Sequence, residues 1–207
     1  MDFMSLENGL TELFAPLFQK IENLLATRER VCVAIDGRCC AGKTTLAKRL
    51  EQAYPCIVVH MDHFFLPLEL RTAERLNTPG GNVHYERLLQ EVSSHLNRRG
   101  EFSYRAYDCR TRDYYKIKMP DAPLIIVEGS YSHQPQLAGS YDLKVFLTLS
   151  KEAQWERLMG RENAEKLPRF QSEWLPMEEL YFSELRIPER ADIVFDTAPQ
   201  NTFCEGL

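Results

Sequence analysis

The sequence predicts an α/β fold in which helices cover both faces of a mainly parallel, five-stranded sheet, a three-layer α/β/α arrangement. Short apolar segments rich in β-branched residues recur along the chain, and longer segments with apolar residues at three- and four-residue steps lie between most of them. Strands that alternate with helices are joined by right-handed crossovers, which make neighbouring strands parallel. Hydrophobic residues make up 44% of the chain and charged residues 27%, which is typical of a globular protein.

Five short apolar segments have the pattern of strands that are buried on both faces. They are residues 31–36, 56–60, 123–129, 142–149 and 191–196. Helical periodicity is present in residues 6–25, 43–54, 85–96, 151–163 and 171–186. Because proline lacks an N–H, we expect Pro16 to kink or divide the first helix and Pro176 to interrupt the last. Residues 102–119 alternate aromatic and charged side chains around an Asp-rich middle, which predicts a β-hairpin.

The length of 207 residues favours a single domain. We expect it to comprise an N-terminal helix (1–29), a nucleotide-binding core (31–196), a hairpin flap (102–119) and a lid region (160–170). A net charge of −5 argues against a general binder of nucleic acid or membrane surfaces. The longest apolar run has five residues, and the first ten residues lack the basic region of a secretory signal, so we expect a cytoplasmic protein. The six cysteines form no C-x-x-C pair, which favours reduced thiols over disulfides or a zinc site.

A phosphate-binding motif carries the strongest functional signal. Residues 37–44, GRCCAGKT, match GxxxxGK[ST] directly after a predicted strand and directly before a predicted helix. Glycines let the backbone wrap around phosphate oxygens, the lysine reaches the β- and γ-phosphates, and the threonine hydroxyl coordinates Mg²⁺. The sequence therefore predicts a P-loop NTPase fold that binds ATP and Mg²⁺, and a chance glycine-rich turn is the alternative. The expected nucleotide-binding residues are Gly37, Arg38, Cys39, Cys40, Ala41, Gly42, Lys43, Thr44 and Thr45.

Two cysteines occupy free positions of this loop. Cys39 and Cys40 lie near the N-terminus of the following helix, a position that lowers the pKa of a thiol. Redox control of nucleotide binding is one interpretation of this pair, and a purely structural role is the other.

The remaining motifs favour a small-molecule kinase among P-loop proteins. No Asn-Lys pair occurs in the chain, so the guanine-reading motif of switch GTPases is absent. The predicted strand LIIV is followed by a single acid, Glu128, where motor ATPases usually have an acidic pair. Asp62 follows the strand CIVVH at the edge of the sheet where ligands bind, so it is a candidate general base or a helix cap. Glu128 is a candidate magnesium ligand through water, or a residue that ends its strand.

Basic residues in the C-terminal half supply candidate phosphate contacts. Arg157 and Arg161 are four residues apart and share one face of a predicted helix. They can stabilise a phosphoryl group during transfer, or they can pair with neighbouring acids such as Glu162. The predicted hairpin interleaves arginines and lysines with tyrosines, which suits either a substrate flap or an ordinary exposed surface.

Together these segments resemble the uridine kinase and phosphoribulokinase family of P-loop kinases, over residues 31–195. The resemblance rests on the P-loop, HMDHFFLP (60–67), YD (107–108), VEG (127–129) and YDLKVFLTLSKEAQWERLMGRE (141–162). It implies that Asp62 activates the acceptor hydroxyl, that the Glu128 position assists magnesium, and that Arg157 and Arg161 contact phosphates. The acceptor-binding residues that we expect from it are Asp62, Phe65, Tyr107, Asp108, Arg112 and Glu128.

The chain departs from this family in the acceptor pocket. Uridine kinases carry Tyr-Asp-Phe-x-x-His-x-Arg, where this chain has YDCRTRDY (107–114) and no histidine. We expect a kinase that transfers the γ-phosphoryl group of ATP to a hydroxyl of a nucleoside or similar metabolite. Pantothenate, a sugar phosphate or a ribosyl cofactor precursor are alternative acceptors, and a non-catalytic nucleotide-binding regulatory module is the alternative of another class. No nucleic-acid or membrane partner is expected, and a homo-oligomer is left open.

Overall fold

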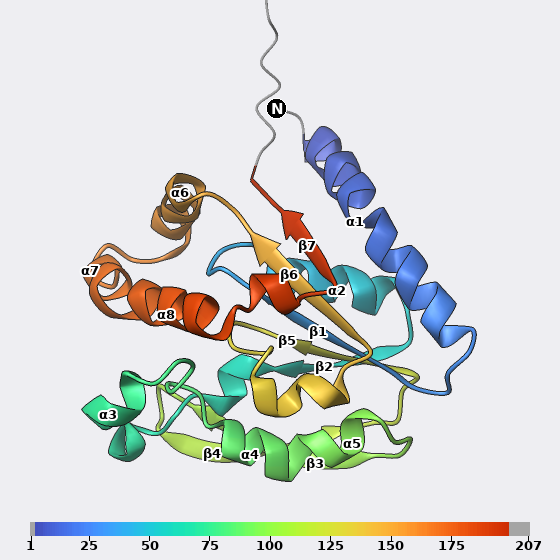
Figure 1. Cartoon of the computed structure of the whole chain (residues 1–207), viewed down its shortest axis with the longest axis horizontal. Coiled ribbons are helices and arrows are strands. Elements are labelled where there is room, and N and C mark those ends of the chain that lie inside the picture. The colour runs from blue at the N-terminus through green and yellow to red at the C-terminus, as the bar shows by residue number, and fades with distance from the viewer. Residues whose placement is uncertain (1–2, 199–207) are drawn as a thin grey trace, which may run out of the picture.

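The computed structural model describes residues 3–198, which contain a five-stranded and a two-stranded sheet. The strands of the larger sheet are β1 (Val31–Gly37), β2 (Cys56–His60), β5 (Leu124–Glu128), β6 (Leu143–Thr148) and β7 (Ile193–Asp196). Their order is β2-β5-β1-β6-β7, and every neighbouring pair is parallel (Figure 1). The predicted parallel sheet is therefore confirmed. Because β1, β5 and β2 are neighbours, the segments that follow their carboxyl ends meet at one edge of the sheet.

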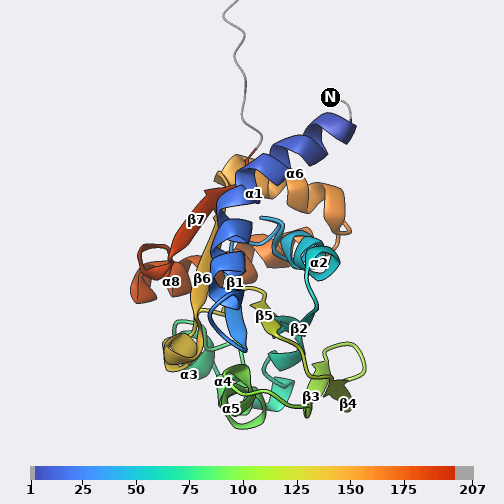
Figure 2. The same cartoon turned by 90° about the vertical axis from the view of Figure 1, so that its right-hand side faces the viewer.

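Helices cover both faces of this sheet. They are α1 (Phe3–Leu25), α2 (Lys43–Ala53), α3 (Ala73–Leu76), α4 (Tyr85–Leu88), α5 (Ser94–Leu96), α6 (Lys151–Arg161), α7 (Leu167–Arg169) and α8 (Leu175–Leu185). In Figure 2, α2 lies on one side of the sheet and α8 on the other. Among residues 3–198, no helix combines the length and the apolar character that a membrane span requires.

Alternate residues of the strands enter two separate hydrophobic cores. Val31 and Val33 of β1 pack with buried residues of α1 and α2. Cys32, between them, packs on the opposite face with Tyr181 and Phe182 of α8 and with residues of α4 and α5. A strand with an apolar residue on each face must be covered on both sides. The two cores thus confirm the three-layer arrangement.

The predicted hairpin is also present. β3 (Phe102–Asp108) pairs antiparallel with β4 (Asp113–Met119), from Phe102 opposite Met119 to Asp108 opposite Asp113. Tyr104 and Ala106 of β3 join the core that contains α8, whereas most of β4 is exposed. The division into core, flap and lid stays a prediction, and Cys204 and the tail after residue 198 lie outside the described residues.

The two prolines affect their helices in different ways. α1 is one continuous helix across Pro16, so this proline does not divide it, but Figure 2 shows the helix changing direction partway along its length, as expected of a kinked helix. Phe14, Leu17 and Ile21 are buried on one side of this helix, and Pro16 is exposed. Pro176 lies in the first turn of α8, so the regular α-helix is interrupted just before this proline, as predicted, although helical structure continues. A π-helical turn, Phe170–Trp174, precedes it and continues from α7, so helical structure begins at Leu167 rather than at residue 171.

Candidate active site

The phosphate-binding motif forms the connection between β1 and α2. Cys40 (φ 62°) and Gly42 (φ 93°) both have left-handed backbone conformations, which in such loops turn successive N–H groups toward one side and create an anion-binding concavity. The Nζ of Lys43 donates hydrogen bonds to the carbonyl oxygens of Gly37 (2.6 Å) and Arg38 (2.9 Å). Because α2 begins at Lys43, the positive end of a helix adds to the charge of the ammonium group.

A buried glutamate from α8 braces this loop. Both carboxylate oxygens of Glu178 accept hydrogen bonds from the backbone N–H of Cys39, at 2.9 and 3.0 Å. Ser130 Oγ (2.9 Å) and Gln154 Nε2 (3.2 Å) donate to the same carboxylate, and Gln154 Nε2 also donates to the carbonyl oxygen of Cys39 (3.2 Å). Burial raises the pKa of Glu178 to about 7, and the charge of Lys43 opposes this shift. Both polar groups of the Cys39 peptide are therefore held by side chains.

Glu178 is a site residue that our sequence interpretation missed. It precedes the buried residues Tyr181 and Phe182 by three and four positions, so it shares their face of α8. An acid on the apolar face of a helix was the signal that could have revealed it.

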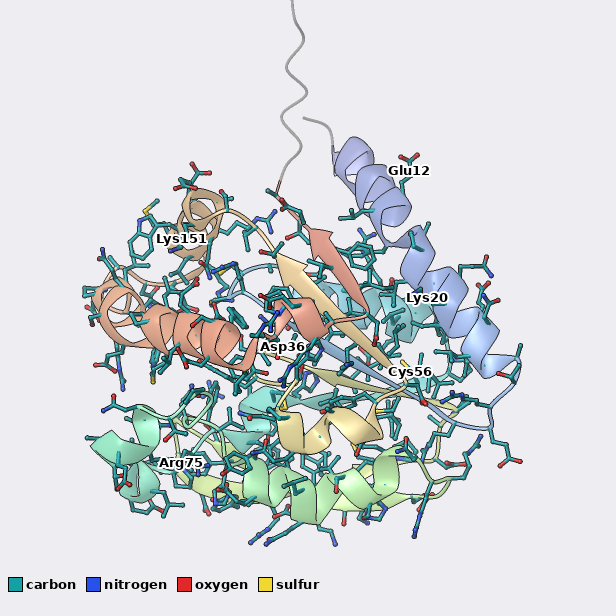
Figure 3. The ribbon with its side chains drawn as sticks, in the orientation of Figure 1. Glu12, Lys20, Asp36, Cys56, Arg75 and Lys151 are labelled. Carbon is teal, nitrogen blue, oxygen red and sulfur yellow. The ribbon has the colours of Figure 1, made fainter. Side chains whose placement is uncertain are left out.

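A second buried acid organises the segment that follows β5. Asp36, at the end of β1 and near the centre of the molecule in Figure 3, accepts hydrogen bonds from the backbone N–H groups of Gly37 (2.7 Å), Tyr131 (3.1 Å) and His133 (2.9 Å). The hydroxyl of Tyr181 donates to it as well, at 2.8 Å. Asp36 thereby joins the start of the phosphate loop to the segment after β5 and to α8.

Glu128 lies where the resemblance places a magnesium-assisting acid. Its buried carboxylate accepts from the hydroxyl of Thr44, at 3.2 and 3.3 Å, and lies 2.6 Å from Nδ1 of His60. The hydrogen bond with Glu128 raises the pKa of His60. A hydroxyl and a carboxylate are oxygen donors of the kind that Mg²⁺ accepts, and this ion takes few protein ligands beside phosphate and water. The donor set of Thr44 and Glu128 therefore fits magnesium.

Asp62 presents a free carboxylate beside these groups. It lies in the turn after β2 (Met61–Phe64), and its side chain is exposed to solvent. Crowding by protein atoms and the negative charge of Glu128 raise the pKa of Asp62, while Lys43, His60 and Arg161 lower it. The structure therefore brings Lys43 and Glu128 into the electrostatic range of Asp62 at one edge of the sheet.

The two arginines of α6 differ in their surroundings. Arg157 Nη1 donates to the carbonyl oxygen of Cys40 (3.2 Å), and its guanidinium also contacts Thr197. Arg157 therefore connects the phosphate loop to the end of β7. Arg161 Nη2 lies 3.3 Å from Cys39 Sγ, on the same side as Asp62. Both arginines are engaged with protein groups, since Arg161 also pairs with Glu162, with its Nε 3.2 Å from Oε1. Of the other loop residues, Arg38 pairs with Glu179, Ala41 is buried, and Thr45 is exposed.

The residues expected to bind the acceptor are less closely gathered. Tyr107 is buried, and its ring packs against that of Tyr114 with centroids 5.1 Å apart. Asp108 and Arg112 hold the hairpin turn, since Asp108 accepts from the backbone N–H of Arg110 (2.8 Å) and Arg112 has a left-handed conformation (φ 61°). Phe65 forms an isolated antiparallel β-bridge with Val83. Within residues 3–198, none of these four hydrogen-bonds to Asp62.

Arg71 is a second residue that our sequence interpretation missed. Its Nε donates to the carbonyl oxygen of Leu66 (2.6 Å), and its guanidinium lies close enough to the thiol of Cys109, at the tip of the hairpin, to lower the pKa of that thiol. The thiol of Cys109 is also within electrostatic reach of Asp62. Arg71 therefore places a positive charge between the hairpin tip and the segment that carries Asp62. Nothing in the local sequence distinguishes it from other loop arginines.

Comparison with solved structures identifies proteins of the same fold. A possible uridine kinase from Bacillus stearothermophilus aligns over 87% of this chain and 100% of its own, with a TM-score of 0.64 and 23% identity. A candidate fructose transport system kinase from Silicibacter sp. TM1040 aligns over 94% and 99%, with a TM-score of 0.63 and 22% identity.

A D-glycerate 3-kinase from Cryptococcus neoformans aligns over 83% of this chain and 88% of its own, with a TM-score of 0.50 and 13% identity. No protein-family model matches the sequence, and neither does any curated protein. These likenesses concern the course of the backbone. The chain therefore has the fold of the P-loop kinases, as the resemblance in its sequence predicts.

Proposed function

We propose that the protein is an ATP-dependent kinase that transfers the γ-phosphoryl group to a hydroxyl of a small molecule, with a nucleoside or similar metabolite as the first candidate acceptor. The observation that carries this proposal is the meeting of Lys43, Asp62 and Glu128 beside the phosphate loop. Positive charge, a free carboxylate and a metal-binding acid are the groups that phosphoryl transfer requires.

ATP fits the loop by the chemistry of its donors. The left-handed conformations of Cys40 and Gly42 are those of loops that bind anions, and a Cβ at Gly42 would meet no atom within 4 Å, so this glycine supplies backbone conformation rather than space. Lys43 now donates to two loop carbonyls and can turn toward phosphate oxygens instead. Magnesium, held by Thr44 and through water by Glu128, would neutralise charge on the phosphates. His60 fixes the Glu128 carboxylate through their 2.6 Å contact.

Asp62 is the proposed general base. Its carboxylate is exposed, so an acceptor hydroxyl can reach it, and its raised pKa makes it a better proton acceptor than an ordinary aspartate. Lys43 and Arg161 balance the negative charge that spreads over the transferred group. The proposed roles of Arg157, Tyr107, Asp108 and Arg112 are supporting ones, in the loop and in the hairpin beside the acceptor.

One observation favours the alternative group of acceptors. Arg71 faces the hairpin tip and takes part in none of the ion pairs formed among residues 3–198. A half-buried guanidinium without an acidic partner can bind a phosphate or carboxylate of an acceptor. A sugar phosphate or another acidic hydroxyl compound therefore stands beside the nucleosides. A cytoplasmic location and the lack of nucleic-acid and membrane partners stay predictions, as does the oligomeric state.

The test is a screen of a metabolite pool with MgATP, in which mass spectrometry detects compounds that gain one phosphoryl group. Wild-type protein should produce at least one such compound and an equal amount of ADP. Lys43→Ala should lower this transfer by about 100-fold or more, since it removes a charge aimed at the phosphates. Lys48→Ala, an exposed lysine one turn further along α2, is the matched control and should keep wild-type rates.

Two results would contradict the proposal. ATP binding without turnover against any acceptor would favour the regulatory module. Equal rates for wild type and Lys43→Ala would show that the loop does not bind the transferred phosphate.

A further inference from the structure

The phosphate loop contains two adjacent thiols that the proposed reaction does not use. Cys39 and Cys40 are both half-buried, and their sulfur atoms are 3.8 Å apart. Arg161 Nη2 lies 3.3 Å from Cys39 Sγ, and Lys43 is also close enough to act on both thiols. A sulfur atom between a thiol donor and a guanidinium is in a position that stabilises negative charge.

Charges of both signs surround Cys39: Arg161 and Lys43 favour its thiolate, and the carboxylate of Glu178, which accepts from the Cys39 N–H, opposes it. The two thiols share one hydrogen bond, in which either sulfur can be the donor. This hydrogen bond and the positive charges of Arg161 and Lys43 hold the pKa of Cys39 well below that of an ordinary cysteine despite partial burial. The same hydrogen bond raises the pKa of Cys40, because Cys40 keeps the shared proton. We assign the negative charge to Cys39 because Arg161 contacts its sulfur directly.

The other described cysteines have the opposite setting. Burial raises the pKa of Cys32, which lies inside the sheet, and that of Cys56, which reaches about 11. Cys109 is exposed at the hairpin tip, and crowding by protein atoms raises its pKa too. Among the cysteines of residues 3–198, Cys39 alone combines access to solvent with a setting that favours the thiolate.

We propose that Cys39 is a modification site of the phosphate loop, a reactive thiolate that exchanges with small disulfides, and that this modification and nucleotide binding exclude each other. In the exchange, the Cys39 sulfur attacks one sulfur of the reagent disulfide and forms a mixed disulfide with it. The S–S bond of the reagent breaks, and its other half leaves as a thiolate. No external oxidant is needed, because the reagent disulfide is reduced as the mixed disulfide forms.

The mutual exclusion rests on the proposed function. Arg161 and Lys43, which stabilise the thiolate, are the groups that would bind the phosphates of ATP. Bound phosphates would withdraw this positive charge from Cys39 and cover its sulfur. A mixed disulfide would in turn remove the negative charge that holds Arg161 and place a bulky group at the mouth of the loop. Coupling between two equilibria is reciprocal, so a mixed disulfide that prevents nucleotide binding is itself disfavoured when nucleotide is bound.

The experiment compares two variants with 5,5′-dithiobis(2-nitrobenzoic acid) as the probe, monitored by thionitrobenzoate release. One variant, C109S/C204S, keeps Cys39, and the other, C39S/C40S/C204S, keeps the exposed Cys109 instead and removes both thiols of the loop. At pH 7 the first should react about tenfold faster or more than the second, because thiolate population controls the rate. Its rate should rise with pH at a midpoint well below that of the second variant. Peptide mass spectrometry should locate the fast adduct on Cys39.

Two further measurements separate the thiol chemistry from the proposed function. Isothermal titration calorimetry measures MgATP binding to C109S/C204S before and after labelling, and the labelling rate is measured with and without MgATP. The expected result is binding that is lost on labelling, and labelling that saturating MgATP slows about tenfold or more.

The outcomes differ for the two claims. If unlabelled protein binds MgATP but Cys39 reacts no faster than Cys109, the proposed modification site is wrong and the proposed function stands. If labelled protein binds MgATP unchanged, the mutual exclusion is wrong. If unlabelled protein fails to bind MgATP while Cys39 reacts rapidly, the proposed function is wrong and the reactive thiol stands.

Discussion

At the scale of residues, the four acids of the candidate site differ in their burial and in their hydrogen bonds. Asp36 and Glu178 are buried, and each accepts a hydrogen bond from a backbone N–H of the phosphate loop. Glu128 is buried but contacts Thr44 and His60, and Asp62 is exposed. Burial and hydrogen bonding thus separate structural acids from those available for chemistry. The same residue type positions the loop in one place and, in the proposed reaction, accepts a proton in another.

The pKa of Glu178 gives a testable dependence of stability on pH. Its value is raised in the folded protein from 4.5 to about 7, so the folded state binds the proton more tightly than the unfolded state. The stability contribution is therefore present below pH 4.5 and is lost as pH rises toward 7. By the usual conversion, the loss amounts to about 3 kcal/mol at most.

Urea unfolding of wild type and Glu178→Gln at pH 5 and pH 7.5 measures this effect. The unfolding free energy at pH 7.5 minus that at pH 5 should be more negative for wild type than for Glu178→Gln, because glutamine does not titrate. Both proteins carry Cys39→Ser for this measurement, because the Cys39 thiol interacts with Glu178, and the remaining titrating groups then cancel. Identical pH differences for the two proteins would show that Glu178 keeps an ordinary pKa.

At the scale of elements, α6 presents one face to the phosphate loop. Gln154 contacts the carbonyl of Cys39, Arg157 that of Cys40, and Arg161 the sulfur of Cys39. These positions are spaced by three and four residues, which places them on one side of the helix. α8 supports the same loop through Glu178 and through the pairing of Arg38 with Glu179. α6 and α8, which are both distant from the phosphate loop in sequence, therefore determine its shape.

The contact between β1 and β6 requires the first glycine of the loop. Gly37 has φ 140°, and a Cβ there would lie 2.1 Å from the carbonyl oxygen of Leu147, which is backbone of a neighbouring strand and cannot move aside. Gly37→Ala should lower the free energy of unfolding by about 3 kcal/mol, from overpacking and strain together. Gly100→Ala is the control, since Gly100 has φ 125° but open space around its Cβ.

Chemical denaturation of the two alanine variants provides the measurement. We expect Gly100→Ala to lose about 1 kcal/mol, from backbone strain alone. Equal losses for the two variants would mean that the close approach of Gly37 to β6 does not contribute.

At the scale of the whole molecule, strand order creates the site. The neighbours β2, β5 and β1 bring the segments with Asp62, Glu128 and the phosphate loop to one edge, although these residues are far apart in sequence. The net charge of −5 is compatible with a cluster of cations at this edge, formed by Lys43 and Arg161. A local positive potential in an acidic protein suits a single triphosphate better than a polyanion.

Much of this arrangement could be predicted, because local pattern determines it. Buried strands, the phosphate loop and the hairpin each have a signature within a few consecutive residues. Glu178 could not be assigned, because its partner Cys39 is 139 residues away and helical periodicity does not identify contacts between elements. Arg71 was missed for the same reason. The π-helical turn before Pro176 depends on packing that no local pattern encodes.

The most direct test of the central claim is Asp62→Asn, measured both for MgATP binding and for phosphoryl transfer to an acceptor found in the metabolite screen. Asp113→Asn, at an exposed position of the hairpin, is the control. The account predicts unchanged ATP affinity and a loss of transfer of about 100-fold or more for Asp62→Asn, because the amide cannot accept the proton of the hydroxyl. Wild-type transfer rates in Asp62→Asn would contradict it.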